Sequence, residues 1–212
     1  MAFNQLSVSN PAASSYADGS TVTAIGGKQA ETLVSEVHGK WFTAAYRGKV
    51  FFASTLIAGT IIPISTTTTA TFALYNPIGS GVNVELIHYD VGLTAITAVV
   101  GALCLGFSAV LPLAPTSLTA VTAFPAIIGG SAAASARCYS AATITATTSN
   151  YVIGNFTTTN TTAAQGLGPF QMHHEFDGKV ALGPGTLVHT CMNTAAQTVA
   201  MTQTFAWAEW PV

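Results

Sequence analysis

The side chains best suited to chemistry gather late in the chain. The run HHEFD begins at His173, and His189 and Cys191 follow it. Imidazoles, thiolates and carboxylates are the usual ligands of transition metals. Neighbouring residues of a β-strand face opposite ways, so His173 and His174 are poorly placed to share a metal ion. His173 shares a face with Glu175, and His189 shares one with Cys191, yet we favour ordinary polar-face or interfacial roles for all of them.

A second pattern around His189 resembles the second metal-binding motif of the cupins, which sits on a jelly-roll fold. Gly178 is followed after five residues by Pro184-Gly185, then by His189 and, after three further residues, by Asn193. The chain departs from that motif at Thr186, where the family has a glycine, and its upstream HxH-and-glutamate motif is lacking. The resemblance implies a cupin-like metalloenzyme around His189, which is the least favoured of our alternatives.

Enzymatic activity in general is disfavoured by the scarcity of titratable groups. The 212 residues include six Lys and Arg and eight Asp and Glu, which is 7% of the chain. No GxSxG, P-loop or GxGxxG motif is present, so no signature of nucleophilic catalysis or nucleotide binding appears. We therefore expect no enzyme, and we assign no catalytic, cofactor-binding or metal-ligating residue.

The balance of hydrophobic and charged residues limits the kind of surface the protein can have. Half of the residues are hydrophobic, and the charged share is far below the typical value of about 25%. A lone soluble monomer needs more charge to cover its surface. Two interpretations remain: a membrane protein, or a protein that is largely covered by copies of itself or by partners.

Membrane and nucleic-acid partners are both disfavoured. The uncharged run from Val91 to Leu111 is rich in Ala, Thr and Gly, and no basic residue flanks it closely, unlike a transmembrane helix. The first residues also lack the basic and apolar regions of a secretory signal. A net charge of -2 and a pI near 6.2 disfavour nucleic-acid binding. We expect Cys104, Cys138 and Cys191 to be buried free thiols, made in a reducing cytoplasm.

The elements that position these side chains are predicted to be β-strands, organised around the stretch from Thr71 to Asp90. Phe72 and Leu74 alternate with their neighbours, and a second alternation places Val82, Val84, Leu86 and His88 on one face. The connection NPIGSG, from Asn76 to Gly81, contains one proline and two glycines, which favour a turn. The stretch therefore predicts a tight antiparallel hairpin.

The rest of the chain predicts an all-β fold, a jelly-roll-like antiparallel β-sandwich over residues 41–212. Residues 1–40 are predicted to form an extended N-terminal arm, because residues 1–30 are polar and cannot bury a core; Thr32–His38 fits a strand or a short helix. Pro112–Ser131 is expected to be loop or extended chain, and Thr157–Gly168 a polar loop. Further strands are predicted at Trp41–Tyr46 paired with Lys49–Ile57, and at Thr60–Ile64, Val91–Ala109, Arg137–Thr147, Tyr151–Thr157, Phe170–Phe176, Lys179–Leu182, Thr186–Met192 and Gln197–Trp210.

Aromatic side chains offer an alternative function, because exposed aromatic rings can stack on sugars. A β-sandwich core uses the same residue types, and we favour the core. A closing strand with two Trp, FAWAEWPV, is also suited to a subunit contact, since Trp is enriched at interfaces. The aromatic candidates are Tyr46, Phe51, Phe52, Tyr75, Tyr89, Trp207 and Trp210.

The segments FALYNPIGSGVNVELIHYD, ALGPGTLVH and FAWAEW resemble those of the jelly-roll capsid decoration (cement) proteins of tailed bacteriophages. The resemblance implies a structural virion protein, made in the host cytoplasm and seated as a homotrimer on the capsid surface. Its arm would reach across the lattice of the major capsid protein, and the family supplies no catalytic residues. The alternative from the same setting is a phage fibre, spike or tail module that recognises a host-surface glycan.

Overall fold

The computed structural model describes residues 39–93, 99–107, 114–144, 149–158, 171–176, 178–193 and 200–212. Within it, Trp41–Val212 forms one compact unit. The predicted arm lies outside the described residues except for Gly39 and Lys40, so its extended form stays a prediction. The predicted polar loop Thr157–Gly168 is wrong at its first two residues, which end the strand Ser149–Thr158, and the rest of it lies outside the described residues. No helix among the described residues is long and apolar enough to cross a membrane.

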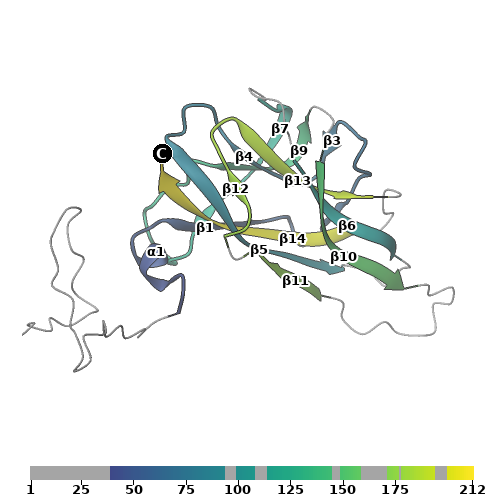
Figure 1. The fold of residues 1–212 in the computed structure, drawn as a ribbon, viewed down its shortest axis with the longest axis horizontal. Helices are drawn as coiled ribbons and strands as arrows, with labels where there is room; N and C mark the ends of the chain where they lie inside the picture. The colour runs from purple at the N-terminus through teal and green to yellow at the C-terminus, as the bar shows by residue number, and fades with distance from the viewer. Residues whose placement is uncertain are drawn as a thin grey trace, which may run out of the picture. The chain divides into compact units, whose positions relative to one another are not determined.

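The compact unit is an all-β sandwich of two antiparallel sheets, as the sequence predicts (Figure 1). Sheet 1 has the order β11-β5-β14-β1-β8, with β12 on β5 and β2 on β14. Its strands are β1 (Val50–Ser54), β2 (Thr60–Ile61), β5 (Val82–Leu93), β8 (Phe124–Pro125), β11 (Gln171–Glu175), β12 (Ala181–Leu182) and β14 (Ala200–Pro211).

Sheet 2 has the order β10-β6-β13-β4-β9-β3, with β7 on the free side of β9. Figure 1 shows the two sheets as stacked layers, with β14, β5 and β11 in one and β4, β9 and β13 in the other. The strands of sheet 2 are β3 (Thr69–Ala70), β4 (Ala73–Asn76), β6 (Val99–Phe107), β7 (Thr116–Val121), β9 (Arg137–Thr143), β10 (Ser149–Thr158) and β13 (Thr186–Met192).

The core between the sheets is built from large apolar side chains that alternate along the strands. Phe72 and Phe205 stack with ring centroids 5.0 Å apart, and Tyr89 lies 5.1 Å from Phe205. Trp207 is fully buried in the same cluster. Each buried aromatic removes roughly 150–250 Å² from water, so this cluster supplies much of the hydrophobic stabilisation.

The predicted hairpin is wrong, although its two strands and its turn are present. β4 pairs with β13 and β9 in sheet 2, whereas β5 pairs with β14, β11 and β12 in sheet 1. The turn therefore crosses from one sheet to the other, with Gly79 and Gly81 at positive φ. The buried Asn76 holds it, because its Nδ2 donates to the carbonyls of Val82 (2.8 Å) and Leu182 (2.9 Å).

The predicted strand Trp41–Tyr46 is also wrong, since Phe42–Tyr46 is the short helix α1. Its Ala44 packs on the outer side of sheet 1 against Val50 and Ile87. The predicted partner, β1, already pairs with β14 on one side and with β8 on the other, so it has no free edge for a strand at Trp41–Tyr46. The prediction for Lys49–Ile57 is confirmed as β1, and all three cysteines are buried free thiols as expected.

Candidate functional site

A β-bulge in β5 decides which side chains reach the outer side of sheet 1. Trp207 of β14 is opposite Leu86, but the preceding Ala206 is opposite His88, so Ile87 is an extra residue. Before the bulge Leu86 faces the core, and after it Tyr89 does. The predicted alternation placed His88 on the core face, which is wrong because a bulge reverses the phase of a strand.

The bulge assembles a cluster that the sequence alone did not reveal. This His–carboxylate cluster consists of His88 and Asp90 on β5 with His173 and Glu175 on β11, which face each other across the two strands. His173 Nδ1 lies 2.6 Å from Asp90 Oδ1, and its Nε2 lies 3.5 Å from Glu175 Oε1. His88 Nε2 lies 3.3 Å from Asp90 Oδ2. The predicted pairing of His173 with Glu175 on one face is confirmed.

The two histidines of the cluster differ in their electrostatics. The hydrogen bond to Asp90 raises the pKa of His173 above its ordinary value of 6.5. Partial burial lowers the pKa of His88 below the same value, although Asp90 acts in the opposite direction. Between the two pKa values His173 is therefore an imidazolium while His88 is neutral, and His173 forms charge-assisted contacts with both carboxylates.

The histidines considered as metal ligands lie in separate environments. Over the described ranges, no group of three or more His, Cys, Asp and Glu is placed to hold a metal ion. His174 points away from His173, and its ring contacts Tyr151 and Phe176 with centroids 5.7 and 4.8 Å away. Desolvation lowers the pKa of His174. The two adjacent histidines, His173 and His174, therefore lie in different environments on opposite faces of β11, as the strand geometry predicted.

His189 and Cys191 lie on β13 and are both fully buried. His189 Nδ1 lies 3.2 Å from the Thr190 carbonyl, and its Nε2 has no hydrogen-bond partner in the described part of the chain. Burial lowers the pKa of His189 to about 4 and raises that of Cys191 to about 12. A neutral imidazole and a protonated thiol are thus the forms present at neutral pH, and neither is an activated catalytic group.

Most of the predicted aromatic platform belongs to the core, which is the interpretation that we favoured. Phe51, Tyr75, Tyr89 and Trp207 are at most 6% exposed. The prediction that Trp207 takes part in a subunit contact is therefore wrong, because its side chain is fully buried in the single chain. Trp210 is 38% exposed, and its indole Nε1 donates to Glu85 Oε2 at 2.8 Å. It remains the aromatic side chain of that strand that a partner can reach.

A buried carboxylate fixes the long connection between β8 and β9. Glu209 is 4% exposed, and its carboxylate accepts hydrogen bonds from the backbone amides of Ser135 and Ala136, both at 2.9 Å. The indole Nε1 of Trp207 donates to it at 3.1 Å. These three donors replace water around the charge. Nothing in the sequence distinguished Glu209 from an exposed residue of the closing strand.

The two sheets differ sharply in charge. The described strands of sheet 1 carry four carboxylates, whereas those of sheet 2 carry a single charged side chain, Arg137 on β9. The outer side of sheet 2 contains small clusters of Ala, Tyr, Leu and Cys instead, whose members are at most 7% exposed in the single chain. Its edge strands expose the apolar Val152 and Leu118, at 57% and 45%.

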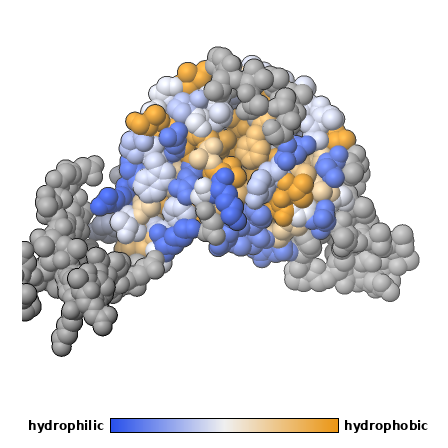
Figure 2. Space-filling view, in the orientation of Figure 1, coloured by the Kyte–Doolittle hydropathy of each residue, from blue (hydrophilic) through white to orange (hydrophobic). Residues whose placement is uncertain are grey.

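Apolar side chains are also exposed near α1 and at the β1–β2 connection. Figure 2 shows apolar residues among polar ones on the face in view. Phe52 of β1 stacks on Phe124 of β8 at 5.9 Å, and Phe124 is itself half exposed. Leu56, Ile57 and Ile128 are more than four-fifths exposed. Apolar side chains this exposed can take part in a contact with a partner where they gather into one patch.

No family model, curated protein or solved structure matches the chain. The function therefore rests on the geometry of the described residues.

Proposed function

We propose that this protein is a structural virion protein, a capsid decoration or cement protein that binds and stabilises the major capsid protein lattice as a homotrimer on the capsid surface. The observation that carries the proposal is the nearly uncharged sheet 2, with Arg137 its single charged side chain among the described strands. Burying an ion in an interface costs several kcal/mol, so a face without ions packs against copies or partners without that penalty.

The order of the strands supports the jelly-roll form of the sandwich. The eight strands β1, β4, β5, β6, β10, β11, β13 and β14 can be numbered one to eight along the chain. Sheet 1 then has the order 1-8-3-6 and sheet 2 the order 2-7-4-5. Successive strands alternate between the sheets except for strands 4 and 5, which pair in sheet 2, and this order is that of the two Greek keys of a jelly roll.

The exposed apolar residues and the predicted arm supply the contacts that such a protein needs. Leu56, Ile57 and Ile128 stay uncovered in a single chain, and an assembly would bury them. The arm of residues 1–40 would extend along the capsid lattice. The proposal includes no enzymatic activity, no cofactor, no membrane and no direct contact with nucleic acid.

The experiment is co-sedimentation with capsids assembled from the major capsid protein. Full-length protein should pellet with capsids, and a variant that lacks residues 1–30 should keep its β-sheet circular dichroism but pellet less. Val152→Lys, which places a charge on sheet 2, should weaken attachment or self-association more than Asn83→Lys, its control on sheet 1. Failure of the full-length protein to pellet would overturn the function, and unchanged attachment of the truncated protein would remove the role of the arm.

One observation favours a second candidate, a fibre, spike or tail module that binds a host-surface glycan. The half-buried Trp210 lies beside the Glu85 carboxylate, and an aromatic ring next to a hydrogen-bond acceptor is suited to a sugar. Binding on a glycan array that Trp210→Ala abolishes would favour this candidate. Glycan binding that survives the substitution would remove Trp210 from the site.

A further inference from the structure

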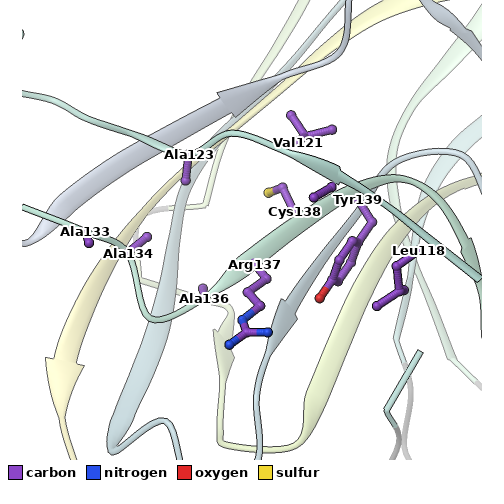
Figure 3. A pocket seen from close by; sticks show the side chains of 10 residues that line it. Leu118, Val121, Ala123, Ala133, Ala134, Ala136, Arg137, Cys138 and Tyr139 are labelled. Carbon is purple, nitrogen blue, oxygen red and sulfur yellow. The ribbon is translucent and has the colours of Figure 1, made fainter. Parts of the chain in front are cut away.

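A pocket opens where β7 and β9 meet the connection between β8 and β9. It has a volume of about 480 Å³, within the range of small-molecule sites. Most of its lining is aliphatic, with Leu118, Ala120 and Val121 from β7, Ala123 from the short link between β7 and β8, and Ala133 and Ala134 from the connection (Figure 3). Small alanine side chains leave room for a slender apolar chain.

The pocket lining also contains one cationic side chain, that of Arg137. Arg137 is exposed, and no other charged side chain is present in the described strands of sheet 2. No hydrogen bond or ion pair joins its guanidinium to another described residue. Tyr139, two residues further along β9, also lines the pocket, and Figure 3 shows both side chains extending to the same side of the strand. A guanidinium and a phenol side by side suit a carboxylate.

The wall of the pocket is held in place from the interior. Ala136 lines the pocket, and its backbone amide donates to the buried Glu209 carboxylate at 2.9 Å, as does that of Ser135. The opposite wall is irregular, because β7 shifts register twice against β9 and Ser117 has a φ of 54°. An edge of this shape does not pair well with a regular incoming strand. An alkyl chain fits it better than a peptide.

We propose that this pocket binds a medium-chain aliphatic carboxylate. The alkyl chain packs against Leu118 and Ala120, which lie on the same side of the β7–β9 ladder as Tyr139, and the carboxylate accepts hydrogen bonds from the Arg137 guanidinium and the Tyr139 hydroxyl. No covalent step is involved. The pocket lies on β7 and β9 of sheet 2, but its binding of a carboxylate does not rest on the proposed function, because the probe experiment uses the isolated protein without capsids.

The experiment is isothermal titration calorimetry of the full-length protein with octanoate and, as an uncharged probe of equal chain length, with 1-octanol. Octanoate should bind with one site per chain and about tenfold or more tighter than octanol, since a hydrogen bond to a charged group contributes at least that factor. Arg137→Gln should remove most of this difference. Lys179→Gln, which removes an exposed cation outside sheet 2, should change neither affinity.

A second variant tests the aliphatic lining of the pocket and leaves Arg137 unchanged. Ala133 is exposed at the rim, so Ala133→Leu should fill the pocket and weaken both probes while the protein stays folded. The proposal is overturned if octanoate shows no saturable binding, if it binds no tighter than octanol, or if Arg137→Gln and Lys179→Gln have equal effects. Equal binding to the wild type and Ala133→Leu would place the site elsewhere and overturn it as well.

Discussion

Replacing His189 by leucine should remove a pH dependence from the stability of the protein. His189 is fully buried, its Nε2 has no partner among the described residues, and burial lowers its pKa from 6.5 to about 4. In the unfolded chain the imidazole takes up a proton as the pH falls below about 6.5. In the folded protein burial keeps the imidazole neutral until the pH approaches 4. Its contribution is therefore fully present above pH 6.5 and is lost as the pH falls from 6.5 toward 4.

The size of the effect follows from these two pKa values. Over the whole window the wild type should lose about 3 kcal/mol of unfolding free energy on account of His189, and between pH 8 and pH 5 about 2 kcal/mol. The comparison at pH 5 is preferable because most carboxylates are still ionised there. His189→Leu should lack this loss, and it should be no less stable than the wild type at pH 5.

The assay is urea unfolding at pH 8 and pH 5, at fixed protein concentration, followed by tryptophan fluorescence. His173→Leu is the matched control. Because its pKa is raised by Asp90, His173 stabilises the fold below about pH 6.5 and less as the pH rises through its folded value, which is the opposite sign. Parallel profiles for the wild type and His189→Leu, or an imidazole of His189 that titrates near 6.5 by NMR, would refute the reasoning.

Two further predictions concern stability. Glu209→Ala leaves two backbone amides and one indole without an acceptor, so it should lower the unfolding free energy by about 3 kcal/mol. The control Glu85→Ala should change the unfolding free energy by about 0.5 kcal/mol or less. Equal effects of the two variants in urea unfolding would contradict the buried role of Glu209. Gly59→Ala puts a Cβ within 2.8 Å of the Met201 backbone at a φ of +70° and should cost about 2 kcal/mol or more. Gly79→Ala, with open space around a φ of +74°, should cost about 1 kcal/mol, and a reversed order of thermal midpoints would contradict the packing at Gly59.

The sequence predicted most strands because period-two alternation and glycine-rich turns are local signals. It could not predict pairing, which depends on residues far apart. The turn from Asn76 to Gly81 looks the same whether β4 and β5 pair or enter different sheets, and the contacts that decide it come from β13 and β14. The buried side-chain amide of Asn76, which bonds to Leu182 about a hundred residues later, has no local signature either.

The His–carboxylate cluster could be predicted in part from the sequence. The adjacent apolar residues Leu86 and Ile87 break the alternation of β5, and this break marks the bulge that turns His88 outward. The partnership of Asp90 with His173 needs the β5–β11 register, which no local pattern contains. The burial of Glu209 equally depends on a connection that lies about seventy residues earlier in the chain.

The assembly proposal is tested most directly by the mass of the protein in solution, measured by light scattering on a sizing column. The proposed homotrimer, whose stoichiometry is the one implied by the resemblance to decoration proteins, would have a mass near three times 21.7 kDa. The predicted mass should persist on dilution to micromolar concentrations. A stable monomer of 21.7 kDa would mean that this surface remains uncovered in water, and it would contradict the homotrimer on which the proposed function depends.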